Sequence, residues 1–114
     1  MAAAKYPRRG DLVWIDFNPQ SGSEQAGRRP AVVLSPESYN RKVGLALLAP
    51  VTGQIKGYPF EVAIPDGLPV SGVVLADQIK SLNWRVRNAT RICIIPKRTI
   101  DEILGKSRTL LSEE

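Results

Sequence analysis

Arg29 marks the border between a polar segment and an apolar one, and its side chain is suited to binding an anion there. The segment before it, residues 18–28, is long for a connection between strands and has Glu24 as its only acid. The backbone is fixed where such a segment enters a strand, and a guanidinium held at that point can bind two oxygens of a phosphate. The alternative is that Arg28 and Arg29 are surface charges paired with Glu24 or Asp16.

A second segment, PVTGQIKGYPFEV from Pro50 to Val62, places three different polar functions between glycines. Thr52 offers a hydroxyl, Lys56 a cation and Tyr58 an aromatic ring. Because glycine lets a loop approach another polymer closely, such a segment can contact a phosphate and stack a base. The alternative is an ordinary hairpin connection with Tyr58 in the core.

The sequence has no histidine and a single cysteine, Cys93. This excludes serine–histidine triads, ribonuclease chemistry based on histidine and most metal sites. Cys93 lies between two isoleucines without a base partner, so we expect a packed side chain and not a nucleophile. Any catalysis must come from carboxylates, hydroxyls, lysine or arginine, and we expect neither a metal nor a cofactor.

The size and composition of the chain suit one globular domain. It has 114 residues, of which 43% are hydrophobic, and we expect a single domain over residues 1–114. The N-terminal residues lack the apolar stretch of a signal peptide, and no apolar run is long enough to cross a membrane. These features predict a soluble protein of the cytoplasm with no membrane partner.

The charge of the chain is basic and unevenly distributed. The net charge is +5, and the segment from Gln78 to Ile100 contains several basic residues but no acid. A basic surface favours polyanions such as nucleic acids. An ordinary solvated face would have the same composition, so the charge alone leaves both interpretations open.

Glycines and prolines divide the chain into short apolar segments, which is typical of a compact β-rich domain. The runs at 31–35 and 45–51 are apolar throughout, which predicts strands buried on both faces. The segment 72–84 is interrupted at Asp77, where we expect a bend. Together the expected strands are 11–17, 31–35, 45–51, 60–64, 72–84 and 91–95.

The C-terminal residues follow the spacing of a helix instead. In TIDE, Thr99 and Glu102 match a capping box, with a hydroxyl at the N-cap and a carboxylate three residues later. The apolar residues that recur at helical intervals are Ile100, Ile103, Leu104, Leu110 and Leu111. A shorter helical turn is expected after Ser35 or Pro36. The sequence thus predicts a β-rich α+β fold, with a strongly bent sheet or small barrel closed by one C-terminal helix.

Four stretches, taken in order, resemble one known family: RGDLVWIDFNP, GSEQAGRRPAVVLSP, KGYPFEV and GVVLADQIKSLNW. They are similar to the MazF/PemK family of toxin endoribonucleases from toxin–antitoxin modules, and the likeness runs from Arg9 to Arg91. The resemblance implies a small SH3-like barrel of the MazF/CcdB type with a C-terminal helix, whose core spans about 9–111. It also implies a homodimer, single-stranded mRNA as the substrate and a cognate MazE-like antitoxin as a partner.

The resemblance also implies a reaction and a set of site residues. The family cuts RNA without a metal by attack of the RNA's own 2′-hydroxyl, which leaves a 2′,3′-cyclic phosphate and a 5′-hydroxyl. Arg29 in GRRP matches the catalytic arginine, and Thr52 in PVT matches the catalytic threonine. Glu24 in GSEQAG matches an acidic loop residue implicated in activity in part of the family. The side chains expected to bind RNA are Gln25, Arg28, Lys56, Tyr58 and Gln78.

Two positions depart from the better-known members of the family. Arg28 stands where another polar residue is common, and Gly53 stands where a second hydroxyl is common. Both lie near the expected RNA groove and bear on the base sequence that is recognised. Three other functions are open on this fold: a toxin that binds DNA gyrase without cutting RNA, an RNA-binding barrel and an inactive homologue. The pairing of Arg29 with Thr52 favours the nuclease.

Overall fold

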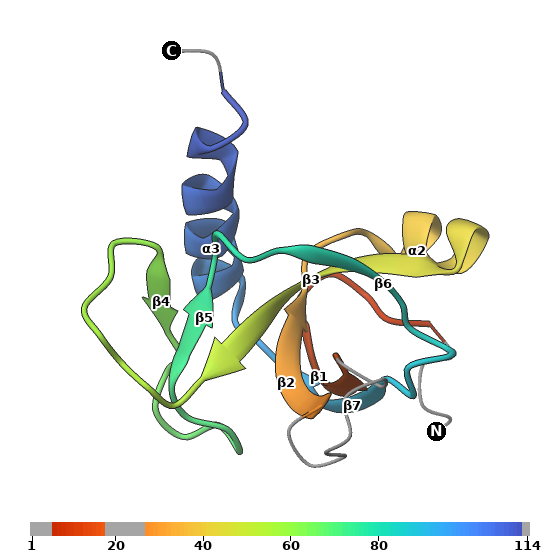
Figure 1. The fold of residues 1–114 in the computed structure, drawn as a ribbon, viewed down its shortest axis with the longest axis horizontal. Coiled ribbons are helices and arrows are strands. Elements are labelled where there is room, and N and C mark those ends of the chain that lie inside the picture. Colours follow the sequence, from red (N-terminus) through yellow and green to blue (C-terminus); the bar gives the residue numbers. More distant parts are fainter. Residues whose placement is uncertain (1–5, 18–26, 113–114) are drawn as a thin grey trace.

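The structure, a computed structural model, describes residues 6–17 and 27–112. Over these residues the chain forms a seven-stranded antiparallel sheet flanked by two helices (Figure 1). The elements are β1 (Asp11–Asp16), β2 (Arg28–Val33), α2 (Glu37–Val43), β3 (Leu45–Thr52), β4 (Glu61–Ala63), β5 (Val73–Leu75), β6 (Lys80–Asn83), β7 (Thr90–Ile94) and α3 (Lys97–Thr109). Within this part of the chain, neither helix has the length and apolar character needed to cross a membrane.

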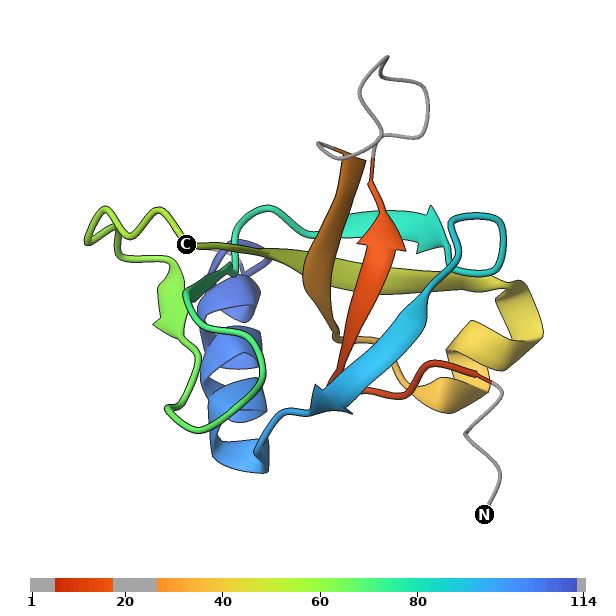
Figure 2. The same ribbon diagram turned by 90° about the horizontal axis from the view of Figure 1, so that it is seen from below.

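Strand β3 connects the two halves of the sheet. One edge of β3 pairs with β2, while the other edge pairs with β6 near its start and with β5 at its end. The strand order is β4-β5-β3-β2-β1-β7, with β6 beside β3. Helix α3 lies against the half that contains β4 and β5, and α2 lies at the other end, where β3 begins (Figures 1 and 2). The C-terminal end of β3 therefore lies where the two halves of the sheet meet.

Each face of the central strands packs against its own hydrophobic core. Along β2, Val32 belongs to the cluster that includes residues of α3, and Val33 belongs to the cluster on the opposite face. Alternating side chains of one strand thus fill two cores, which explains the continuous apolar runs. Burial is confirmed for all of 31–35, although the strand there, β2, begins at Arg28 and ends at Val33, two residues before the predicted end. It is confirmed for 45–51 except at its half-buried first residue and at Leu47, which is 39% exposed.

The predicted strand at 72–84 is two strands, β5 and β6, with a turn at Ala76 and Asp77. Across this turn the Gln78 N–H donates to the Leu75 carbonyl at 3.1 Å. The bend predicted at Asp77 is therefore confirmed. Because of this bend, β5 pairs with the end of β3, and β6 pairs with the same edge of β3 nearer the start of that strand.

The C-terminal helix is confirmed, but its predicted start is wrong. Helix α3 begins at Lys97 with Pro96 at the N-cap, so Thr99 lies inside the first turn and does not cap the helix. The N–H groups of Thr99 and Ile100 both donate to the Pro96 carbonyl, at 3.0 and 3.1 Å. Proline is tolerated at this position because the first N–H groups of a helix have no partner within the helix.

The end of α3 also comes earlier than the apolar spacing predicts. The helix ends at Thr109, and Leu110 and Leu111 beyond it are 53% and 84% exposed. By contrast, Ile100 and Ile103 are buried against the sheet, as the spacing predicts. These two side chains and the half-buried Leu104, and not the final leucines, pack the helix against the core.

Candidate active site

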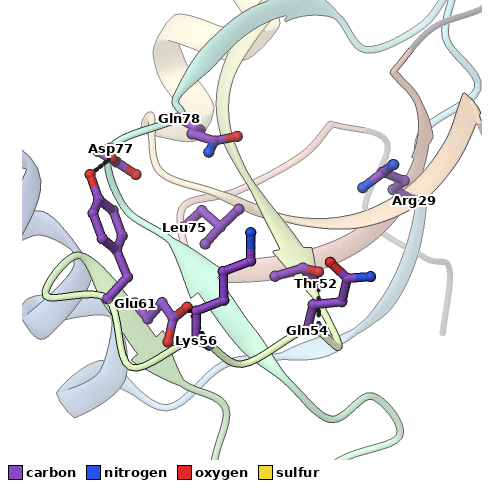
Figure 3. Close-up of a pocket in the computed structure, with 9 residues that line it drawn as sticks. Arg29, Thr52, Gln54, Lys56, Glu61, Leu75, Asp77 and Gln78 are labelled. Atoms are coloured by element: carbon purple, nitrogen blue, oxygen red, sulfur yellow. Dashed lines mark hydrogen bonds between the residues drawn. The ribbon is translucent and has the colours of Figure 1, made fainter.

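The end of β3 opens into a hollow of about 420 Å³ on the surface (Figure 3). It is lined by Arg29, Thr52, Gln54, Lys56, Tyr58, Glu61, Leu75, Asp77 and Gln78. A neighbouring hollow of about 220 Å³ shares four of these residues, namely Arg29, Thr52, Leu75 and Gln78. It is further lined by Phe17, Pro50, Val51 and Lys80. Because they share these residues, the two hollows form one continuous depression, here called the groove.

Arg29 lies near the start of β2 and lines both hollows of the groove. Its backbone is paired with β1, where it stands opposite Ile15. Figure 3 shows the guanidinium facing the groove from the β2 side. The fixed backbone expected for Arg29 is thus present, and it holds a forked donor at the groove's edge.

Thr52 is the last residue of β3 and pairs with Val73 of β5. Its hydroxyl oxygen accepts a hydrogen bond from the Gln54 N–H at 3.1 Å. The hydroxyl therefore keeps its own proton to donate to a ligand. Sequence reasoning did not single out Gln54. The pattern that could have indicated it is a turn in which a threonine hydroxyl accepts a hydrogen bond from the N–H two residues later.

Arg29 and Thr52 lie on neighbouring strands, β2 and β3, and line the same groove. The ladder pairs Val33 with Leu48 and Ala31 with Pro50. The β2–β3 pairing ends at Ala31 and Pro50. If this register continued for two more residues, Arg29 would stand opposite Thr52. Both residues line both hollows. The groove thus brings together an arginine and a hydroxyl from separate segments of the sequence.

Glu61 fixes the segment that forms one wall of the groove. Its carboxylate accepts hydrogen bonds from the N–H groups of Lys56 and Gly57, at 3.0 and 3.1 Å. Lys106 of α3 holds the same segment, because its ammonium group donates to the Pro59 carbonyl at 2.7 Å. Sequence reasoning missed Glu61 and Lys106, since no local pattern indicates side chains that bond the backbone of a distant loop.

Tyr58 lies in the wall of the groove, which excludes the alternative that placed it in the core. The side chain is 46% exposed, and its ring packs on Phe60 with 5.9 Å between the ring centres. Its hydroxyl donates to Asp77 at 2.7 Å. This hydrogen bond and the negative charge of Asp77 raise the pKa of Tyr58 above its ordinary value of 10.0. The second carboxylate oxygen of Asp77 is buried and has no partner among the described residues.

Gln78 and Lys80 reach the groove from the β5–β6 side. Gln78 is exposed and lines both hollows, so this predicted RNA-binding residue lies in the same groove as Arg29. Lys80 lies with its nitrogen 5.6 Å from the centre of the Phe17 ring. Sequence reasoning noted Lys80 only as part of a basic segment, and the structure adds it to the cations of the groove.

Arg28 is a predicted RNA-binding residue that does not line the groove. Its guanidinium donates to the Asp16 carboxylate at 3.0 Å and to the Asn88 carbonyl at 3.0 Å. Hydrogen bonds from Asn88 and Arg28 lower the pKa of Asp16 below its ordinary value. The structure therefore confirms, for Arg28, the alternative interpretation of a surface charge paired with Asp16.

Two of the predicted site residues, Glu24 and Gln25, lie outside the described residues. Across 6–17 and 27–112, no group of three or more histidine, cysteine, aspartate or glutamate side chains is placed to hold a metal ion. The groove carries three cationic side chains, from Arg29, Lys56 and Lys80, beside the carboxylates of Glu61 and Asp77, which are both held in hydrogen bonds. Such an arrangement is suited to an extended polyanion.

The fold and the groove define a class of protein: a small antiparallel β domain with an arginine and a hydroxyl at the end of its central strand. Residues 8–111 match the family described as PemK-like, MazF-like toxin of type II toxin–antitoxin systems. The chain therefore belongs to the PemK-like, MazF-like toxin family, and the resemblance seen in the sequence is confirmed.

Individual relatives agree with this assignment. The chain is 50% identical over 111 residues to the endoribonuclease toxin MazF of Escherichia coli strain K12, covering 97% of this chain and 99% of that protein. It is 30% identical over 108 residues to endoribonuclease PemK of Escherichia coli, covering 91% and 81%.

Solved structures show the same fold. The crystal structure of MazF from Deinococcus radiodurans (Form-I) superposes with a TM-score of 0.86 at 52% identity, covering 95% of this chain and 98% of that one. A chain in the Form-II MazE–MazF structure from the same organism gives 0.85 at 46% identity, covering 97% and 100%. The predicted β-rich α+β fold with a C-terminal helix is confirmed.

Proposed function

We propose that this protein is a toxin endoribonuclease that cuts single-stranded mRNA at short preferred sequences, with Arg29 and Thr52 in its catalytic site. The observation that carries the proposal is that these two side chains, from neighbouring strands, line one groove together with Lys56 and Lys80. Relatives at 50% and 30% identity, named endoribonuclease toxin MazF and endoribonuclease PemK, support the same activity.

The proposed reaction is a transesterification within the RNA. The 2′-oxygen of one ribose attacks the adjacent phosphorus, and the bond from that phosphorus to the 5′-oxygen of the next nucleotide breaks. One fragment then ends in a 2′,3′-cyclic phosphate, and the other begins with a 5′-hydroxyl. Because the RNA supplies the nucleophile, the protein needs no activated serine or cysteine, which suits a chain without histidine.

Arg29 and Thr52 act on the charge that develops during this reaction. Negative charge builds on the phosphoryl oxygens in the transition state, and donors fixed in advance lower its energy. Arg29 offers two N–H groups from a paired strand, and Thr52 offers a hydroxyl whose oxygen is already anchored by Gln54. The loss of one such donor raises the barrier by about 3 kcal/mol.

Two protons must also move. The 2′-hydroxyl loses a proton to a base as it attacks, and the leaving 5′-oxygen gains one from water, to which the protonated base then returns its proton. We assign Glu24 as the candidate general base, since a carboxylate can accept the proton from the 2′-hydroxyl. An arginine side chain remains protonated in proteins, so the role of Arg29 is electrostatic.

The RNA is bound by side chains that lie beside Arg29 and Thr52. We propose that Lys56 contacts a phosphate, that Tyr58 stacks on a base, and that Gln25 and Gln78 hydrogen-bond to base edges. The bonds that Glu61 makes to the wall segment support this role, because they fix the backbone that carries Lys56 and Tyr58. Arg28 is expected to contribute less, since its guanidinium is bonded to Asp16.

We further propose that the protein is a cytoplasmic homodimer inhibited by a cognate antitoxin. Structures of MazE–MazF from Deinococcus radiodurans at 46% and 50% identity support an antitoxin partner. An acidic, partly disordered antitoxin segment would suit the groove, because Arg29, Lys56 and Lys80 would attract it as they attract RNA.

A comparison of two oligonucleotides tests the proposed chemistry. The first is an RNA that contains a mapped cleavage site, and the second is the same RNA with a single 2′-deoxynucleotide on the 5′ side of the scissile phosphate. We expect the first to be cut and the second to stay intact at that bond. Equal cleavage of both would exclude attack by the 2′-hydroxyl.

A further inference from the structure

Gly72 approaches Thr52 more closely than any other amino acid would allow. A Cβ atom built on Gly72 would lie 2.3 Å from the Thr52 carbonyl oxygen and 3.0 Å from its carbonyl carbon. Separations under 3.0 Å are not tolerated between a Cβ atom and backbone, so the backbone at Gly72 or at Thr52 would have to move. Gly72 also has a φ of +123°, a conformation that side chains rarely adopt.

The surroundings of Gly72 leave little room for such a movement. Its carbonyl accepts a hydrogen bond from the Ile64 N–H at 3.0 Å. The next residue, Val73, pairs with Thr52 on one side and with Ala63 on the other. Figure 1 shows β5 between β4 and the end of β3. A displacement caused by a methyl group at Gly72 would therefore be transmitted to the end of β3.

We propose that Gly72 is a positioning residue for catalysis, because its missing side chain sets the place of the Thr52 hydroxyl in the groove. The inference rests on the proposed function, in which Thr52 donates a hydrogen bond to the reacting phosphate. Gly72 itself does not line the groove. It acts through the carbonyl of Thr52, which belongs to the same residue as the donating hydroxyl.

The chain contains a matched control for this proposal. Gly67 lies in the same connection between β4 and β5 and also has a positive φ, of +91°. A Cβ atom on Gly67 would meet nothing within 4 Å. Gly67→Ala therefore introduces backbone strain of the same kind without a contact to Thr52.

The first test compares Gly72→Ala and Gly67→Ala in steady-state RNA cleavage. We expect Gly72→Ala to lower kcat by about 10-fold or more while KM changes by less than about threefold, as for a lost transition-state contact. Gly67→Ala should keep kcat within about twofold of wild type. Equal losses in the two variants would overturn the proposal, because strain in the connection would then explain both.

A double-mutant cycle separates an effect on Thr52 from a general loss of structure. In the Thr52→Val background the hydroxyl is absent, so adding Gly72→Ala should lower kcat by less than about twofold. If Gly72→Ala lowers kcat by the same factor in both backgrounds, Gly72 does not act through Thr52 and the inference is wrong.

NMR of the free protein tests the placement without reference to activity. The methyl resonance of Thr52 should shift in Gly72→Ala and stay unchanged in Gly67→Ala, and an unchanged resonance in both would contradict the proposal. If the wild-type protein does not cut RNA, the proposed function fails, whereas this readout still decides whether Gly72 places Thr52.

If Gly72→Ala does not fold, the wild-type protein provides the decisive measurement. Titration with a 2′-deoxy oligonucleotide of the cleavage sequence should shift the amide signals of Gly72 and Thr52 together, with the Gly67 signal unmoved. A shift at Thr52 without one at Gly72 would overturn the inference.

Discussion

Arg28 and Arg29 are adjacent in β2, yet their side chains have different surroundings. Arg28 donates to Asp16 at 3.0 Å, whereas Arg29 lines the groove beside Thr52. Successive side chains of a strand point to opposite faces, so the pair of arginines divides between the two sides of the sheet. One arginine therefore pairs with β1 at the start of β2, and its neighbour lines the groove.

This division predicts that Arg29 governs catalysis. Arg29→Ala should lower kcat/KM for RNA cleavage by about 100- to 1,000-fold, since a preorganised donor to the transition state is lost. Arg29→Lys should recover only part of the activity, because an ammonium group lacks the fork of a guanidinium. Initial rates on a defined RNA measure both variants. Full activity in Arg29→Ala would remove Arg29 from the mechanism.

Arg28→Ala is expected to act mainly on stability. The ion pair with Asp16 is partly exposed, with side-chain exposures of 36% and 25%, so its loss should lower the free energy of unfolding by at most about 1 kcal/mol. Urea unfolding measures this change. A cleavage defect as large as that of Arg29→Ala, at unchanged stability, would restore Arg28 as a principal RNA contact.

The same ion pair predicts a dependence of stability on pH. The pKa of Asp16 is lowered in the folded protein by hydrogen bonds from Asn88 and Arg28. A lowered pKa stabilises the fold above the ordinary value of 3.8, and this contribution is lost as the pH falls through the lower folded value. Wild type should therefore be more stable than Asp16→Asn at about pH 7, and the difference in their free energies of unfolding should be smaller at about pH 3. A difference that is constant across this range would contradict the assignment.

Thr52 should contribute through its hydroxyl and not through its bulk. Thr52→Val keeps the branched shape but removes the donor, and we expect kcat to fall by about 100-fold. Thr52→Ser keeps the donor and should stay within about 10-fold of wild type. Single-turnover cleavage with excess protein measures both. Similar rates for the valine and serine variants would show that the hydroxyl is not used.

The hydrogen bond between Tyr58 and Asp77 should matter for RNA affinity more than for the chemical step. Tyr58→Phe keeps the ring for stacking but releases the wall segment from Asp77, so KM should rise about two- to fivefold with little change in kcat. Tyr58→Ala removes the ring as well and should raise KM further. A higher KM for Tyr58→Phe than for Tyr58→Ala would argue against stacking by Tyr58.

Much of the fold could be predicted from the sequence because it depends on local patterns, whereas Arg29 and Thr52 were matched to a catalytic pair only through the family resemblance. Runs of apolar residues mark the strands buried on both faces, and the interruption at Asp77 marks the turn between β5 and β6. The start of α3 is mispredicted because a capping-box pattern in TIDE competes with Pro96, whose carbonyl accepts the first bonds of the helix.

The supports of the site could not be predicted, because they depend on contacts between distant segments. The carboxylate of Glu61 bonds the backbone of Lys56, and the ammonium group of Lys106 reaches Pro59 from another element. Gly72 was one glycine among nine in the sequence, and only the fold shows its approach to Thr52. Spacing along the chain contains no information on such approaches.

The central claim is most directly tested by cleavage of a long mixed-sequence single-stranded RNA in the presence of EDTA. Wild-type protein and Arg29→Ala would be compared, and the new 5′ ends would be mapped and tested for a hydroxyl. We predict discrete cuts that carry 5′-hydroxyl ends and disappear in the variant. Intact RNA with the wild-type protein across several unrelated transcripts, or 5′-phosphate ends, would contradict the account.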